Sequence, residues 1–68
     1  MRIGRELRRA RESAGLSQEE LGKKAEITRV YVSLLERDKK SPTLAVLSRI
    51  CKALNVAPSE LLARAEND

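Results

Sequence analysis

Residues 17–36 read SQEELGKKAEITRVYVSLLE, and this stretch decides the fold. Ser17 begins it and Glu20 follows three residues later, which is the capping-box pattern that starts an α-helix. Thr28 offers a second N-cap, because a threonine hydroxyl accepts a hydrogen bond from a free amide of the first helical turn. The stretch therefore predicts two short helices joined by residues 26–28.

The second of these helices, from about residue 28 to residue 36, has apolar residues on two faces. Val32 and Leu35 share one face, which we expect to point into the core. Val30 and Leu34 lie on the opposite face, where they would make a poor solvent surface. They would suit the major groove of DNA, because apolar atoms there meet thymine methyl groups. The alternative is that this outer face packs against another protein.

Polar residues accompany the outer apolar pair. Ser33 and Arg37 lie beside it on the helical wheel, and Arg29 and Tyr31 lie at its flanks. An arginine at the start of a helix that enters the groove can donate two hydrogen bonds to guanine. Two short helices joined by about three residues are typical of the helix-turn-helix, which spans about residues 17–36 here.

Helical patterns also lie on both sides of this stretch. A first helix covers roughly residues 2–14, and Gly15 accepts the left-handed backbone of its C-cap. A fourth helix is capped by Ser41 or Thr43 and ends at Asn55. The predicted apolar stripes are Ile3, Leu7, Ala10 and Ala14 in the first helix, and Leu44, Leu47, Ile50, Cys51 and Leu54 in the fourth.

A short fifth helix begins at Pro58 and carries Leu61 and Leu62, and we expect residues 66–68 to be frayed. No alternating strand pattern is present in the sequence. The prediction is an all-α fold, a compact five-helix bundle in a single domain of residues 1–68. Sixty-eight residues leave no room for a second domain, so we expect no small-molecule effector site.

The charge of the chain favours a polyanionic partner. Fourteen Lys and Arg residues against ten Asp and Glu residues give a net charge of +4. The excess is uneven, because Arg37, Lys39 and Lys40 crowd one short loop and five arginines fall in the first helix. We expect the loop, with the amides that begin the fourth helix, to bind phosphates. A merely solvated basic surface is the alternative.

The residue inventory argues against several other classes. The sequence has no histidine, and its one cysteine, Cys51, falls on an apolar stripe. These facts predict no enzyme, no metal site, no cofactor and no internal disulfide. No apolar run approaches the roughly 20 residues of a membrane span, and nothing resembles a signal peptide, so a cytoplasmic location is expected.

Five segments of the chain together carry a family resemblance. They are LSQEEL at 16–21, ITRVYVS at 27–33, LER at 35–37, PTL at 42–44 with Leu47, and ALNV at 53–56. This pattern, from Ile3 to Leu62, resembles the phage-repressor and Cro-like helix-turn-helix family, also called the xenobiotic-response-element type. The resemblance implies a lambda-repressor-like domain whose third helix enters the major groove.

The resemblance also assigns roles to individual residues. Arg29, Val30, Ser33 and Leu34 match positions that face bases. Gln18 matches a position that holds a phosphate and braces the recognition helix, while Thr28 and Tyr31 match positions beside the DNA backbone. Arg11 and Glu36 match a partly buried salt bridge between the first and third helices, which implies a structural role for Arg11.

The chain departs from the family at three positions. Gly22 stands where alanine is usual, Glu26 stands where glycine is common in the turn, and Asp38 stands where glycine often follows the third helix. A left-handed Glu26 would cost roughly 1–2 kcal/mol. Asp38 would tolerate that conformation better.

We expect a sequence-specific double-stranded DNA-binding transcriptional regulator, a repressor or controller of bacterial or phage origin. One recognition helix covers too few base pairs to discriminate against competing sites, so we expect a homodimer on a palindromic operator. The resemblance favours pairing through the fifth-helix end, where we expect one of the adjacent leucines Leu61 and Leu62, with Val56 and Ala57, to form the contact. The alternative is that both leucines close the core. The alternative function is an antitoxin-type or other protein-interaction module on the same fold.

Overall fold

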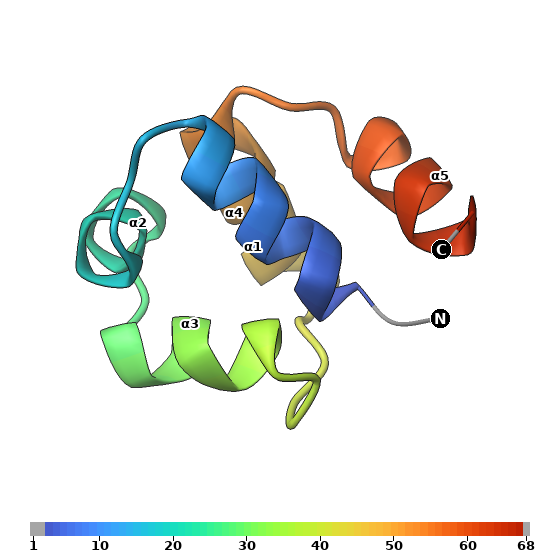
Figure 1. Cartoon of the computed structure of the whole chain (residues 1–68). Helices are drawn as coiled ribbons and strands as arrows, with labels where there is room; N and C mark the ends of the chain where they lie inside the picture. Colours follow the sequence, from blue (N-terminus) through green and yellow to red (C-terminus); the bar gives the residue numbers. More distant parts are fainter. Residues whose placement is uncertain (1–2, 68) are drawn as a thin grey trace.

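Five helices follow one another along the chain in the computed structural model, which describes residues 3–67 (Figure 1). No strand occurs in this range. The predicted all-α, five-helix fold is confirmed. The helices are α1 (Gly4–Ser13), α2 (Gln18–Ala25), α3 (Arg29–Glu36), α4 (Leu44–Leu54) and α5 (Pro58–Asn67).

Side-chain caps define where α2, α3 and α4 begin. The capping box at α2 is confirmed, with the Ser17 hydroxyl accepting from the Glu20 amide and the Glu20 carboxylate accepting from the Ser17 amide. These hydrogen bonds from Ser17 lower the pKa of Glu20. The Thr28 hydroxyl caps α3. Thr43 is the N-cap of α4, so of the two predicted candidates Ser41 is excluded.

Left-handed backbone ends several of the helices. Gly15 follows α1 with φ 73°, and Asn55 ends α4 with φ 57°. Glu26 ends α2 with φ 60°, and Asp38 follows α3 with φ 55°. Glu26 therefore has the left-handed backbone considered for it from the sequence, and the turn between α2 and α3 is strained.

The core is aliphatic and receives residues from all five helices. Val32 and Leu35 of α3 are buried, as predicted. The prediction for Leu44 is wrong, because this residue is 83% exposed and Val46 is buried in its place. Leu44 lies at the edge of the α4 stripe and in its first turn, where the other helices leave it uncovered. The other buried core residues are Leu7, Ala10, Leu21, Ala25, Leu47, Ile50, Cys51, Leu54, Leu61 and Ala65.

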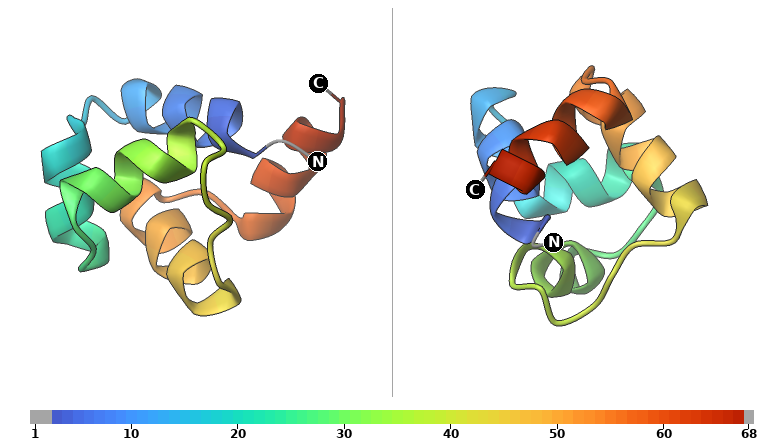
Figure 2. Two further views of the ribbon diagram at one scale, coloured as in Figure 1. Left: turned by 90° about the horizontal axis from the view of Figure 1, so that it is seen from below. Right: turned by 90° about the vertical axis from the view of Figure 1, so that its right-hand side faces the viewer.

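The fifth helix is longer than the sequence suggested. It has ten residues, as many as α1, and includes Glu66, which was expected to be frayed. Leu61 and Ala65 lie four residues apart and are both buried, so they anchor both halves of the helix. Asp68 lies outside the described residues. Figure 2 shows α5 beside α1 and α4.

The amino end of α1 rests directly on the end of α3. A Cβ added to Gly4 would lie 2.5 Å from the Glu36 carbonyl oxygen and 2.6 Å from that of Leu35. Only glycine fits this contact between backbones. The first helix therefore begins at Gly4; Arg2, where the sequence suggested a start, lies outside the described residues.

We predict that Gly4→Ala lowers the free energy of unfolding by about 1–3 kcal/mol, because the new methyl group must displace backbone atoms of α3. Alanine has the better helix propensity, so a local effect would have the opposite sign. Urea unfolding followed by circular dichroism measures the change, and Ser13→Ala at the exposed end of α1 is the control. Equal stability of Gly4→Ala and the wild type would contradict the close contact.

Candidate nucleic-acid interface

The outer face of α3 is an exposed surface of mixed apolar and polar character. Val30 is 59% exposed, one of two large apolar residues that are exposed among the described residues. Arg29 is also exposed, and Ser33 and Leu34 are half-buried. Of the four residues predicted to face bases, Val30 and Leu34 thus lie opposite Val32 and Leu35, Ser33 lies beside them, and Arg29 lies at the flank. The helix lies at the surface that faces the viewer in the left view of Figure 2.

A shallow hollow accompanies this face. It has a volume of about 450 Å³ and is open to solvent, and most of its surface is apolar. Its lining residues are Ile27, Thr28, Val30, Tyr31, Leu34 and Lys40. An apolar hollow with one ammonium group at its margin offers van der Waals contact to a methyl group and a charge to a nearby phosphate.

Glu36, at the end of α3, is the hub of a polar network. Its carboxylate accepts hydrogen bonds from Arg11 Nε at 2.7 Å and Arg11 Nη2 at 3.2 Å. The side chains are only 11% and 4% exposed, so the ion pair that the resemblance implies is present and largely buried. The hydrogen bond with Glu36 raises the pKa of Arg11 despite its burial. Arg11 also donates to the Leu16 carbonyl at 2.7 Å.

Gln18 joins the same network from the start of α2. Its Nε2 donates to Glu36 Oε1 at 3.1 Å, so the amide braces the recognition helix. Gln18 is half-buried, and it sits one residue after the cap of α2. The phosphate contact predicted for it stays a prediction.

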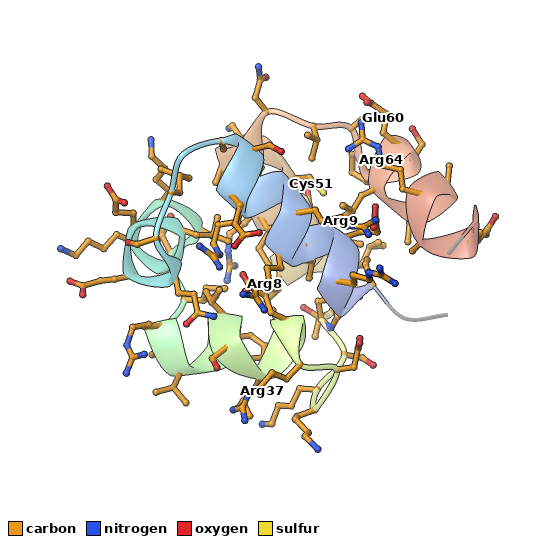
Figure 3. The ribbon with its side chains drawn as sticks, in the orientation of Figure 1. Arg8, Arg9, Arg37, Cys51, Glu60 and Arg64 are labelled. Atoms are coloured by element: carbon orange, nitrogen blue, oxygen red, sulfur yellow. The ribbon has the colours of Figure 1, made fainter. Side chains whose placement is uncertain are left out.

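The loop after α3 is basic and exposed. Arg37, Lys39 and Lys40 are all exposed, and within residues 3–67 neither lysine forms an ion pair or side-chain hydrogen bond. Arg37 Nε approaches the Ser33 carbonyl at 3.4 Å, and Figure 3 shows its side chain directed away from the core. The loop thus presents cations next to the outer face of α3.

The two remaining residues predicted beside the DNA backbone have structural roles as well. The Thr28 hydroxyl accepts from the Tyr31 amide at 3.0 Å, which fixes the first turn of α3. Tyr31 is half-buried and packs against the core. Both also line the hollow beside Val30.

The residues predicted for the dimer contact divide into two groups. Leu61 is 1% exposed and belongs to the core, which corrects its assignment to a surface contact. Ala57 is exposed, and Val56 and Leu62 are half-buried. Consecutive residues of a helix point in directions about 100° apart. The core therefore covers Leu61 and leaves part of Leu62 exposed.

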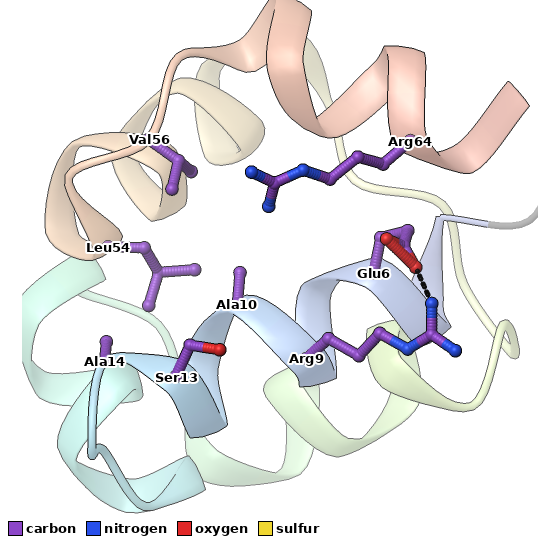
Figure 4. Close-up of a pocket in the computed structure, with 8 residues that line it drawn as sticks. All are labelled: Glu6, Arg9, Ala10, Ser13, Ala14, Leu54, Val56 and Arg64. Atoms are coloured by element: carbon purple, nitrogen blue, oxygen red, sulfur yellow. Dashed lines mark hydrogen bonds and ion pairs between the residues drawn. The ribbon is translucent and has the colours of Figure 1, made fainter. Parts of the chain in front are cut away.

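Sequence reasoning missed a buried carboxylate in α1. Glu6 is 5% exposed and accepts from Arg9 Nη1 at 2.8 Å. Both border a groove of about 470 Å³ between α1, α4 and α5, whose other lining residues are Ala10, Ser13, Ala14, Leu54, Val56 and Arg64 (Figure 4). The spacing of three residues between Glu6 and Arg9 was the available signal, but burial of Glu6 depends on where α5 packs.

The helix-turn-helix family pattern matches residues 7–61, which is most of the chain and includes α2 and α3. The chain belongs to the Cro/C1-type helix-turn-helix family. The described residues, 3–67, include no helix with the length and hydropathy of a membrane span.

Two relatives of this helix-turn-helix domain are named regulators. The immunity repressor protein of Bacillus phage phi105 is 31% identical over 91% of this chain and 43% of its own length. The control protein C.BamHI of Bacillus amyloliquefaciens is 37% identical over 88% of this chain and 75% of its own. The chain therefore spans less than half of the phage repressor.

A solved structure shows the same fold on DNA. The P22 c2 repressor in complex with a synthetic operator has a TM-score of 0.83 and 30% sequence identity, over 90% of this chain and 92% of that one. The five-helix arrangement found here is therefore that of a phage-repressor DNA-binding domain.

We predict that Glu36→Ala lowers the free energy of unfolding by about 3–5 kcal/mol, because it leaves the buried Arg11 charge without its partner. Glu12→Ala is the matched control, since Glu12 pairs with Arg8 at an exposed site and its loss should change stability by less than about 1 kcal/mol. Chemical unfolding measures both. Equal effects of the two substitutions would show that burial of the Arg11–Glu36 pair adds nothing.

Proposed function

We propose that this protein is a transcriptional regulator that binds a specific sequence of double-stranded DNA, as a repressor or controller in a bacterial or phage-infected cytoplasm, and that it is not an enzyme. The outer face of α3 carries the proposal. It exposes Val30 beside Arg29, while Val32 and Leu35 on the opposite face are buried in the core. The family membership and the P22 c2 repressor–operator structure support the same function.

The proposed contacts separate into two kinds. Bases are read from the outer face of α3, where Arg29 donates to guanine and Val30 and Leu34 contact thymine methyl groups. Phosphates fix the register of the protein on the duplex and carry no sequence information. The proposed base-reading residues are Arg29, Val30, Ser33 and Leu34, and the proposed phosphate contacts are Gln18, Thr28, Tyr31, Arg37, Lys39 and Lys40.

We predict that Arg29→Ala and Lys40→Ala weaken DNA binding in different ways. Arg29→Ala should weaken operator binding by about 1–3 kcal/mol and relax the preference at one base position. Lys40→Ala should weaken all duplexes about equally and reduce the salt slope by about one counterion. An operator selected from random DNA, titrated at several salt concentrations beside an unrelated duplex, measures both effects.

The two variants serve as controls for each other, because each removes one cation from an exposed position. If both caused the same uniform loss, Arg29 would be a backbone contact. If the wild type showed no salt-sensitive binding to any duplex, the protein would instead be a protein-interaction module of antitoxin type.

We further propose that the protein binds a palindromic operator as a homodimer. Two copies of α3 placed about one helical turn apart would double the number of base pairs read. Val56, Ala57 and Leu62 offer partly exposed apolar surface near the start of α5 for the two-fold contact, while Leu61 supports them from the core.

We predict that Leu62→Glu yields a folded monomer that loses cooperative operator binding, because the charge would be buried in the subunit contact. Ala63→Glu, at an exposed position of the same helix, should remain dimeric. Sedimentation and half-site binding measure the two properties. Leu61→Glu should fail to fold, because Leu61 lies in the core. A wild type that is monomeric at high concentration and binds a half-site as tightly as a palindrome would exclude the dimer.

A further inference from the structure

Asp38 lies within the basic loop that follows the recognition helix α3, between Arg37 and Lys39. Its backbone is left-handed, with φ 55°, and its amide donates to the Leu35 carbonyl at 3.2 Å. The next amide, that of Lys39, donates to the Leu34 carbonyl at 2.9 Å. Asp38 thus ends α3 and sets the direction in which the chain leaves it.

The side chain of Asp38 contacts the first helix. Its Oδ1 accepts a hydrogen bond from the Gly4 amide at 3.0 Å, across 34 positions of sequence. The first helix needs such an acceptor, because its N-cap residue, Ile3, supplies no side-chain hydrogen bond. A carboxylate at the amino end of a helix is also favoured by the helix dipole. Asp38 therefore caps α1 from another part of the chain.

The backbones at this junction leave little freedom. Gly4 lies so close to the Leu35 and Glu36 carbonyls that no side chain would fit. The hydrogen bond from Gly4 to Asp38 therefore joins two segments that are already in contact, and it ties the start of the basic loop to α1. In both views of Figure 2 the amino end of α1 lies beside the turn that follows α3.

The direction of the Asp38 carboxylate affects how the loop of Arg37, Lys39 and Lys40 would attract phosphate. A carboxylate that pointed outward among these cations would repel phosphate. Turned toward α1, the Asp38 carboxylate instead meets an N–H donor and the positive end of a helix. A loop that is ordered before DNA arrives also pays less entropy on binding.

We infer that Asp38 is a positioning residue for DNA binding: by capping α1 it holds the loop of Arg37, Lys39 and Lys40 in the conformation that contacts phosphate. The inference rests on the proposed function and adds to it a residue that touches no DNA. It predicts that the loop requires a hydrogen-bond acceptor at position 38.

Asp38→Asn and Asp38→Gly test the acceptor at constant charge. Both substitutions remove the negative charge, and both asparagine and glycine adopt the left-handed backbone conformation readily. Asparagine keeps an acceptor oxygen, and glycine does not. Asp38→Gly should bind the operator about three- to tenfold more weakly than Asp38→Asn, the factor that one hydrogen bond contributes to an equilibrium. Their salt slopes should be equal, because their cations are the same. Exchange of the Gly4 amide with solvent should be faster in Asp38→Gly by a similar factor.

Measurements at a temperature where both variants are fully folded exclude a loss of affinity through unfolding. Equal operator affinity of Asp38→Asn and Asp38→Gly would overturn the inference, and so would equal exchange of the Gly4 amide. A wild type that binds no duplex would overturn the proposed function instead, while the exchange experiment would still report whether Asp38 holds Gly4.

Discussion

The position of the recognition helix α3 depends on the hydrogen bonds that the Glu36 carboxylate accepts. This carboxylate lies at the end of α3 and receives hydrogen bonds from Arg11 on α1 and Gln18 on α2. The Glu36 side chain thereby attaches both α1 and α2 to α3. Because the Arg11–Glu36 pair is mostly shielded from water, a displacement of α3 would separate two buried opposite charges, which is costly.

The same end of α3 is held a second time by backbone groups. Gly4 packs on the last carbonyls of α3, and the Gly4 amide donates a hydrogen bond to the Asp38 carboxylate. The hydrophobic contacts of Val32 and Leu35 fix which face of α3 points inward, while these polar and backbone contacts fix its position along its own axis. Base readout needs both, because hydrogen bonds to base edges require side chains at defined places in the groove.

The buried face of α3 contributes to the stability of the free protein, and the exposed face does not. Burial of Val32 and Leu35 stabilises the free protein. Exposure of Val30 gives the free protein nothing, and its apolar surface becomes favourable only against another apolar surface such as thymine methyl groups. The basic loop beside it adds a charge-dependent attraction to any duplex. In the proposed complex with DNA, affinity and specificity would therefore come from adjacent but separate parts of one short segment, residues 29–40.

Local rules in the sequence determined where α2 and α3 begin and which face of α3 is buried. The Ser17–Glu20 box and the Thr28 cap involve residues three apart, so they form within one turn. The family resemblance added the Arg11–Glu36 pair, which spacing alone does not indicate. Side-chain periodicity, however, gives only the direction of a residue from its helix axis. Whether a neighbouring helix covers that direction depends on packing.

Tertiary packing therefore decided the residues at the edges of the stripes. Leu44 is exposed and Val46 buried, because the first turn of α4 is covered on only one side. Leu61 enters the core and Leu62 stays partly free, because α5 contacts the bundle along a narrow line. The hydrogen bond from Gly4 to Asp38 joins segments distant in sequence and leaves no local pattern. The burial of Glu6 likewise does not follow from its local spacing to Arg9, so only the folded arrangement establishes these two features.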